Sequence, residues 1–270
     1  MMNKKLLSFI ILVLALGGLV AVADASHSWG GYHWGRTANP FTLELGDNVS
    51  AAWDGYLATT ASDWSISSVL NTIVKAGKTK PRVCKAINGR VEVCSEAYGF
   101  NGWLGLAQVW VSGGHIVKGT TKVNDTYFNT PTYDTSAWRN LVMCQEVGHT
   151  LGLDHQDEGF GNPNLGTCMD YTNDPESNQH PNQHDYDMLE SIYAHLDSVN
   201  TIILSEDGSG SGGGGNGKGK PEGTGRDIDL GDPSAWGKVV RQDAQGRNSL
   251  YVRDLGAGDK VFTFVIWAQR

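Results

Sequence analysis

The part of the chain best suited to bind a metal contains two histidines six residues apart, His149 and His155, with Gly152 between them. Glu146 precedes His149 by three residues. On a helix, side chains four residues apart project from one face, so Gln145 and His149 can reach a common point. Gly152 can take a positive φ without steric cost, which ends the helix and returns His155 toward that point. We therefore expect two imidazoles and one carboxylate to converge.

This pattern resembles the zinc-binding signature of the metzincin metallopeptidases, H-E-x-x-H-x-x-G-x-x-H. Glu146, His149, Gly152 and His155 match it position by position, and Gln145 stands where the family has its first histidine. The resemblance implies Gln145, His149 and His155 as zinc ligands and Glu146 as the general base. An amide oxygen is neutral, like imidazole, but it is a weaker zinc donor than nitrogen. We therefore expect weaker zinc binding than three histidines would give.

A second signal lies in the segment Thr167–Tyr171, which reads T-C-M-D-Y. It resembles the Met-turn of astacins and serralysins in its Met-x-Tyr form. By that resemblance, Met169 forms a hydrophobic floor under the ligands, and Tyr171 is placed to touch the metal or the transition state. A methionine considered alone would be read as an ordinary core residue. Its position behind the histidine motif favours the Met-turn.

The resemblance covers residues 41–200 and implies an α+β fold of the metzincin-like zincin type. Such a catalytic domain has a twisted mixed sheet, an active-site helix, the Met-turn and a C-terminal helix. The implied activity is that of a secreted endopeptidase with one catalytic zinc ion, which hydrolyses internal peptide bonds. The alternative is a catalytically weak or inactive protein of the same fold that binds peptides or protein partners in the cleft. Only the first predicts that Glu146→Ala abolishes an activity.

The first 25 residues are typical of a secretory signal peptide. Lys4 and Lys5 precede an apolar run over residues 6–22, and residues 23–25 form a small-x-small cleavage site, so cleavage is expected after Ala25. A membrane anchor is the alternative, because the run is near the short limit for spanning a bilayer. We expect an extracellular protein with no stable membrane insertion once the signal is removed.

The chain is acidic, with a formal net charge of −8. An acidic surface does not suit nucleic acid or an anionic membrane, so we predict neither as a partner. The expected partner is a protein or peptide substrate, and we expect a monomer. Asp157 and Glu158 could bind calcium, but no regular calcium-loop signature is present, and a solvated acidic loop is favoured.

An extracellular location permits disulfides among the four cysteines. Cys84 and Cys94 flank the pair Asn88-Gly89, which is a strong type I′ turn signal, so we pair them across a β-hairpin. Cys144 then pairs with Cys168 by elimination. This second bond would tie the metal-binding helix to the Met-turn.

The remaining catalytic region is expected to alternate strands and helices. Periodicity predicts strands at 41–45, 68–75, 104–110 and 115–123, in addition to the hairpin at 82–97. Helical spacing and capping signals predict three helices. The first covers about 49–64 with Asp47 or Asn48 as N-cap, the second starts at Thr135 or Ser136, and the third follows residues 181–183. By the resemblance, a strand near Ala107–Val111 is an edge strand that lines the cleft and can pair with a substrate backbone.

Four parts of the chain are expected: a signal peptide (1–25), the catalytic domain (26–205), a flexible Gly-rich linker (206–225) and a small β-rich C-terminal region (226–270). The last part has strand-like runs at 238–240, 249–252 and 261–267. About 45 residues in three strands are marginal alone. Three roles remain open for this region: docking on the catalytic domain, a binding appendage, or a sorting or retention element.

Six histidines lie outside the motif, and five of them are considered as candidates. His27 and His33 are interpreted as incidental, and His115 as a surface or hairpin residue. His180 or His184 could in principle replace the missing ligand at position 145, although this is the less favoured interpretation.

Overall fold

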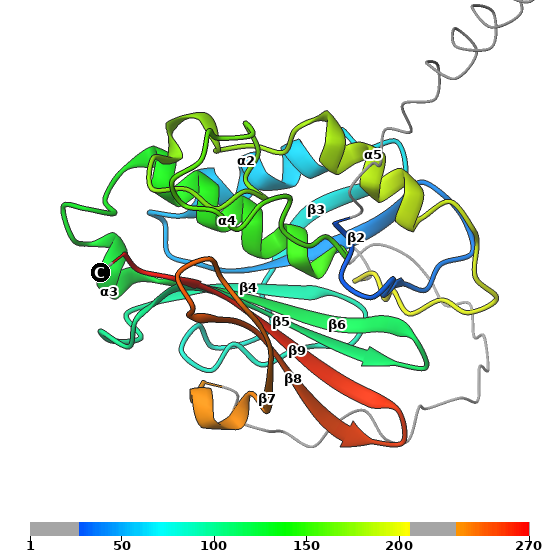
Figure 1. Ribbon diagram of the computed structural model, residues 1–270. Coiled ribbons are helices and arrows are strands. Elements are labelled where there is room, and N and C mark those ends of the chain that lie inside the picture. Colours follow the sequence, from blue (N-terminus) through cyan, green and yellow to red (C-terminus); the bar gives the residue numbers. More distant parts are fainter. Residues whose placement is uncertain (1–26, 206–230, 270) are drawn as a thin grey trace, which may run out of the picture.

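The computed structural model describes residues 27–205 and 231–269. The expected signal peptide (1–25) and the expected Gly-rich linker (206–225) lie outside these residues. Within the described part, no helix is long and apolar enough to cross a membrane. Nine strands form one mixed sheet in the order β3-β2-β4-β6-β5-β9-β8-β7, with β1 paired to β6. The main helices gather on one side of this sheet (Figure 1).

The elements follow the chain in this order: β1 (His33–Trp34), β2 (Phe41–Asn48), α2 (Asp54–Trp64), β3 (Leu70–Ala76), β4 (Val91–Glu96), β5 (Trp103–Ser112), β6 (His115–Asn124), α3 (Asp125–Phe128), α4 (Ser136–Thr150), α5 (Gln183–Ile192), β7 (Lys238–Gln242), β8 (Asn248–Gly256) and β9 (Asp259–Trp267). Two short 3-10 turns lie at Pro175–Ser177 and Pro233–Ala235. The strands and helices form one main hydrophobic core between the sheet and α2, α4 and α5.

Helix α4 is the central helix of the molecule, and every residue from Ala137 to Thr150 except Asn140 is buried. Its start is fixed by Thr135, whose side chain accepts a hydrogen bond from the Trp138 backbone N–H. The last carbonyls of a helix have no hydrogen-bond donor within the helix. Here Trp29 and Trp34 supply donors: their indole N–H groups donate to the carbonyls of His149 and Thr150, each at 2.9 Å.

Helix α2 begins later than its sequence pattern indicates. The expected cap at Asp47 or Asn48 is wrong, because β2 continues through Asn48 and the Asn48 amide donates to Glu92 Oε2 at 2.6 Å. The helix starts at Asp54, and its N-cap residue Trp53 makes no side-chain capping bond. Tertiary pairing of the strand has overridden a local capping signal.

The hairpin expected at residues 82–97 does not form. Only β4 is a strand, and it lies parallel to both β2 and β6. The Gly89 N–H, which a hairpin would use locally, donates to the Val117 carbonyl at 2.8 Å. Cys84 lies in a turn before the strand, and its disulfide to Cys94 ties that turn to β4. Asn88-Gly89 is therefore the bend that leads into a central parallel strand.

The C-terminal strands extend the main sheet. β9 pairs antiparallel with β5 from Trp103↔Trp267 to Val111↔Lys260. In Figure 1 the red strand β9 runs beside β5, and β8 lies beyond β9. The expectation that Ala107–Val111 is a free edge is thus wrong, because β9 of the same chain occupies that edge. Among the roles left open for this region, the structure shows docking on the sheet formed by residues 27–205.

Candidate metal centre and active site

The candidate centre is built by α4 and the turn that follows it. Gln145, Glu146 and His149 belong to α4, and Gly152, with φ at +104°, turns the chain so that His155 returns to the helix end. The Nε2 atoms of His149 and His155 lie 3.0 Å apart. The two histidines therefore converge, as the spacing of the motif predicts.

The hydrogen bonds of these histidines decide which ring nitrogen carries a proton. His149 Nδ1 lies 2.9 Å from the Leu153 carbonyl oxygen, and His155 Nδ1 lies 2.9 Å from Glu158 Oε1. Since both partners are acceptors, each Nδ1 must donate, and each neutral ring then keeps its lone pair on Nε2. Two lone pairs face each other across 3.0 Å, and a cation between them would turn this repulsion into coordination.

Two further polar side chains of the centre lack partners. Gln145 is fully buried, and neither its amide oxygen nor its amide nitrogen makes a hydrogen bond to a described residue. Both carboxylate oxygens of Glu146, which is 1% exposed, also lack a hydrogen bond of ordinary geometry. An unsatisfied buried polar group costs about 1–3 kcal/mol. Two facing imidazole nitrogens, with an unpartnered amide and an unpartnered carboxylate on the helix that carries His149, are a donor set that fits a zinc ion.

Burial sets the protonation states in the centre. It lowers the pKa of His149 well below its usual value and lowers the pKa of His155 to about 3. Both rings are therefore neutral at pH 7, which is the form that binds a metal. Burial also raises the pKa of the Glu146 carboxyl well above its usual value, and the nearby Ile266 backbone opposes this only in part.

The segment Thr167–Tyr171, which is predicted to form a Met-turn, lies against α4, the helix that carries two of the candidate ligands. Met169 is fully buried, and its Sδ is so close to Gly148 that a Cβ added there would lie 2.6 Å away. A disulfide joins Cys144 of α4 to Cys168. The Tyr171 ring packs on the His155 ring with centroids 4.2 Å apart. The segment thus lies under α4 and beside one of the two histidines.

The C-terminal strands close the centre. The Phe264 ring of β9 stacks on the His149 ring, and the Tyr171 hydroxyl donates to the Val265 carbonyl at 3.3 Å. From β7, Arg241 pairs with Asp154 at 2.5 Å and with Glu158 at 2.8 Å. These contacts leave the candidate ligands and Glu146 buried.

The remaining candidates from the sequence lie elsewhere or have other partners. His180 contacts Asp63 Oδ2 at 2.7 Å, and His184 stacks on His27 with centroids 4.8 Å apart. Asp157 Oδ1 accepts hydrogen bonds from the Gly159 N–H and the Asn162 amide, so loop contacts already use this carboxylate.

Sequence reasoning missed one group of polar side chains, formed by His33, His115, His195 and Asp197. The only local signal is the spacing of His195 and Asp197, two residues apart. The other two members lie far away along the chain.

No protein-family model matches the chain, and no curated protein sequence matches it. Among solved structures, the chain is similar to the hatching-enzyme zinc protease HCE-1, a choriolytic enzyme of the medaka fish Oryzias latipes. The identity is 11% and the TM-score 0.35, over 62% of this chain and 96% of that chain. A structure of myroilysin is 12% identical, with a TM-score of 0.33 over 58% of this chain and 82% of that chain.

Proposed function

We propose that the chain is a zinc-dependent endopeptidase whose own C-terminal strands hold it in a closed, latent form. His149, His155 and Gln145 would hold the ion, and Glu146 is the general base. The observation that carries this proposal is the pair of Nε2 atoms 3.0 Å apart; it is supported by the unpartnered side chains of Gln145 and Glu146, which belong to the same helix as His149. Zinc bound there would polarise a peptide carbonyl and acidify a water molecule.

The protein's own residues supply the proton transfers and the hydrogen bonds. Glu146 is a buried carboxylate with a raised pKa, which brings its basicity closer to neutral pH and suits a group that accepts a proton and later releases it. Tyr171 already donates a hydrogen bond to a peptide carbonyl, that of Val265. The same hydroxyl could donate to a substrate carbonyl as negative charge develops on its oxygen.

Strand β9 indicates what kind of substrate the site accepts. It lies antiparallel to β5 as an extended peptide, places an aromatic side chain on His149 and offers the Val265 carbonyl to Tyr171. Strand addition of this kind provides backbone hydrogen bonds independent of sequence. We infer that a substrate binds on β5 in place of β9, as an extended segment with an apolar residue near the metal.

The same contacts support latency. A substrate cannot reach Glu146 while β9 is paired with β5, because Glu146 is only 1% exposed. Arg241 adds two ion pairs that fix β7 to the turn around His155. Hydrolysis therefore requires β9 to leave β5.

The test combines metal analysis with a cleavage assay on the full chain, purified without a histidine tag. Elemental analysis should show that His149→Ala loses one equivalent of zinc relative to wild type, whereas His180→Ala loses none. Peptide cleavage is followed by mass spectrometry in an Arg241→Ala background, which weakens the closed form. Glu146→Gln should keep the zinc and abolish cleavage. Equal zinc in wild type and His149→Ala would refute the proposed centre.

A second candidate is a binding protein without catalytic activity. Gln145 in place of a histidine favours it, because a weaker donor set holds less zinc. On this alternative, the Arg241→Ala variant binds extended peptides, and Glu146→Gln binds them equally well with no cleavage by either. Cleavage that depends on Glu146 decides for the peptidase.

A further inference from the structure

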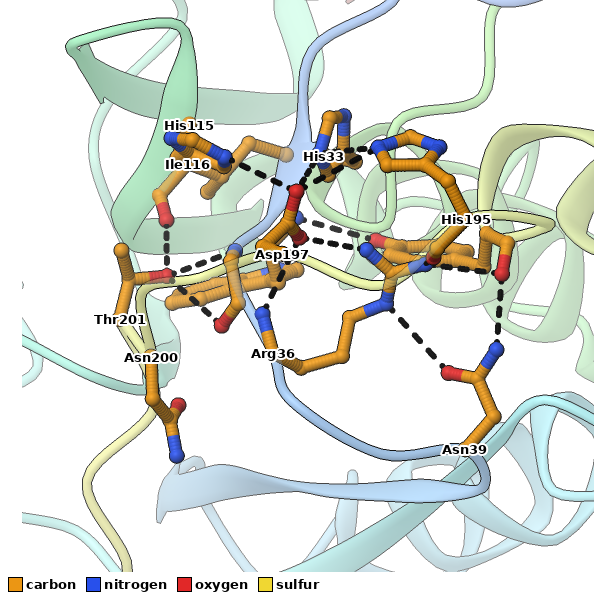
Figure 2. A network of polar contacts seen from close by, with 12 residues as sticks. His33, Arg36, Asn39, His115, Ile116, His195, Asp197, Asn200 and Thr201 are labelled. Carbon is orange, nitrogen blue, oxygen red and sulfur yellow. Dashed lines mark hydrogen bonds and ion pairs between the residues drawn. The ribbon is translucent and has the colours of Figure 1, made fainter.

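Three histidines and one aspartate meet at a place distinct from the candidate active site. His33 lies in β1, His115 is the first residue of β6, and His195 and Asp197 follow α5 (Figure 2). β1 pairs with β6 in parallel with His33 opposite His115, so sheet register brings these two side chains together. The chain after α5 then returns to the same point.

The Asp197 carboxylate contacts all three imidazoles, and the ligand atoms of His33, His115 and Asp197 lie within 4.8 Å of one another. Asp197 Oδ1 lies 3.3 Å from His33 Nε2, 3.2 Å from His115 Nε2 and 3.4 Å from His195 Nε2. His33 Nε2 and His195 Nε2 are 3.2 Å apart. Ligands about 2.0 Å from a tetrahedral zinc ion are separated by roughly 3.3 Å, so these contacts have the spacing of a metal site.

The hydrogen bond at the other nitrogen of His33 makes a simple polar network unfavourable. His33 Nδ1 lies 3.0 Å from the Gly31 carbonyl oxygen, so Nδ1 donates and Nε2 carries the lone pair of the neutral ring. That lone pair faces the Asp197 carboxylate at 3.3 Å. Two acceptors this close repel each other unless the ring is protonated or a cation lies between them.

Asp197 is held in a fixed orientation for this role. Its second oxygen, Oδ2, accepts from the Arg36 guanidinium at 2.6 Å and from the Arg36 backbone N–H at 3.2 Å. Arg36 is itself 1% exposed and also donates to the Tyr193 carbonyl at 2.8 Å. Oδ1 is left to face the three imidazoles.

We propose that His33, His115, His195 and Asp197 bind a second zinc ion with a structural role. Three imidazoles and one carboxylate complete a four-coordinate shell, and such closed shells are typical of structural zinc. The ion would tie β1, the start of β6 and the segment after α5 together. Trp34, the neighbour of His33, donates to the Thr150 carbonyl at the end of α4, so the same tie supports the helix that carries the active site.

The test separates this site from the active site by working in a His149→Ala background. The full chain, without a histidine tag, is stripped with a chelator, incubated with zinc chloride and dialysed, and zinc per chain is measured. We compare the parent with variants that also carry His115→Ala, His195→Ala or Asp197→Asn. His180→Ala is the matched control, because His180 is an exposed histidine whose side chain pairs with Asp63. Circular dichroism confirms that each variant is folded.

The parent should retain about one zinc per chain, and each of the three ligand variants should lose it, whereas His180→Ala should not. Cobalt in place of zinc should give the intense visible absorption of a tetrahedral site in the parent and lose it in His115→Ala. Zinc should also raise the melting temperature of the parent but not that of His115→Ala. A parent without zinc, or zinc content unchanged in His115→Ala and Asp197→Asn, would overturn the proposal and leave a protonated hydrogen-bond network. These results do not depend on peptidase activity.

Discussion

The Phe264 ring lies parallel to the His149 ring, with centroids 4.2 Å apart and the planes 12° from parallel. One residue further along β9, the Val265 carbonyl accepts a hydrogen bond from Tyr171. The strand therefore engages the centre through a side chain and through its backbone at once. Because β9 is also paired along β5, closure of the centre is a property of the sheet as a whole and not of a single lid residue.

Loss of Arg241 should open the centre. Arg241→Ala removes the ion pairs with Asp154 and Glu158, which are only partly exposed. We therefore expect it to weaken docking of the C-terminal strands by about 1–3 kcal/mol. This corresponds to a roughly 5- to 150-fold larger open fraction and a similar gain in the rate of peptide cleavage. The initial rate on a fluorogenic peptide is the measurement.

The matched control for that prediction is Arg253→Ala. Arg253 also belongs to the C-terminal strands, but it donates to the Ala235 carbonyl within the same region. The Arg253→Ala substitution removes an equal charge without touching the centre, so the cleavage rate should stay at the wild-type level. Equal activation by both variants would show that general loosening, and not the Arg241 contacts, controls access.

Replacing Gln145 by histidine should strengthen zinc binding. Gln145 is fully buried, and its amide has no hydrogen-bond partner among the described residues, so coordination of a metal would give this amide its missing contact. We expect Gln145→His to lower the dissociation constant for zinc at least tenfold and Gln145→Ala to raise it. Competition with a chromophoric chelator measures both, in a His115→Ala background so that one site is counted. Wild-type affinity in Gln145→Ala would remove Gln145 from the coordination shell.

The parts of this molecule that could be predicted are those coded by local spacing. Gln145, Glu146 and His149 belong to one helix, and Gly152 and His155 follow within six residues of it, so helix geometry and one turn suffice. The cap at Thr135 is local in the same sense. None of these depends on how the sheet is ordered.

The parts that escaped prediction depend on contacts between distant segments. His33 and His115 meet only because β1 pairs with β6, and no periodicity encodes that register. Phe264 reaches His149 only because β9 adds to β5, more than 140 residues away along the chain. Asn88-Gly89 misled the prediction because parallel pairing of β4 overrides a turn preference worth little energy by itself.

An alanine at Gly148 should destabilise the protein, although glycine in a helix interior is usually about 1 kcal/mol worse than alanine. A Cβ there would lie 2.6 Å from Met169 Sδ and 2.8 Å from the Trp64 ring. We expect overpacking to cost about 1–3 kcal/mol in the free energy of unfolding, measured by urea denaturation. The control is Gly55→Ala in α2, where a Cβ meets no atom within 4 Å, and which should gain up to about 1 kcal/mol. A gain at both positions would contradict the close packing of the Met-turn under α4.

The two disulfides should stabilise the folded protein by similar amounts, although only one of them should affect zinc binding. Cys144–Cys168 closes a separation of 24 residues and joins the neighbours of Gln145 and Met169, whereas Cys84–Cys94 closes 10 residues beside β4. Replacing either pair with alanines should lower the free energy of unfolding by about 3 kcal/mol, because the unfolded chain gains freedom. Urea denaturation in chelator isolates this effect from metal binding.

Only the Cys144→Ala/Cys168→Ala variant should also release zinc more readily. Its lost bond is the covalent link between the ligand helix and the segment that lies beneath it, so the distance between α4 and Tyr171 is no longer fixed. Chelator-driven zinc release, followed by stopped flow in the His115→Ala background, should be faster in this variant and unchanged in Cys84→Ala/Cys94→Ala. Identical release rates in the two variants would mean that packing of Met169 alone positions the Met-turn.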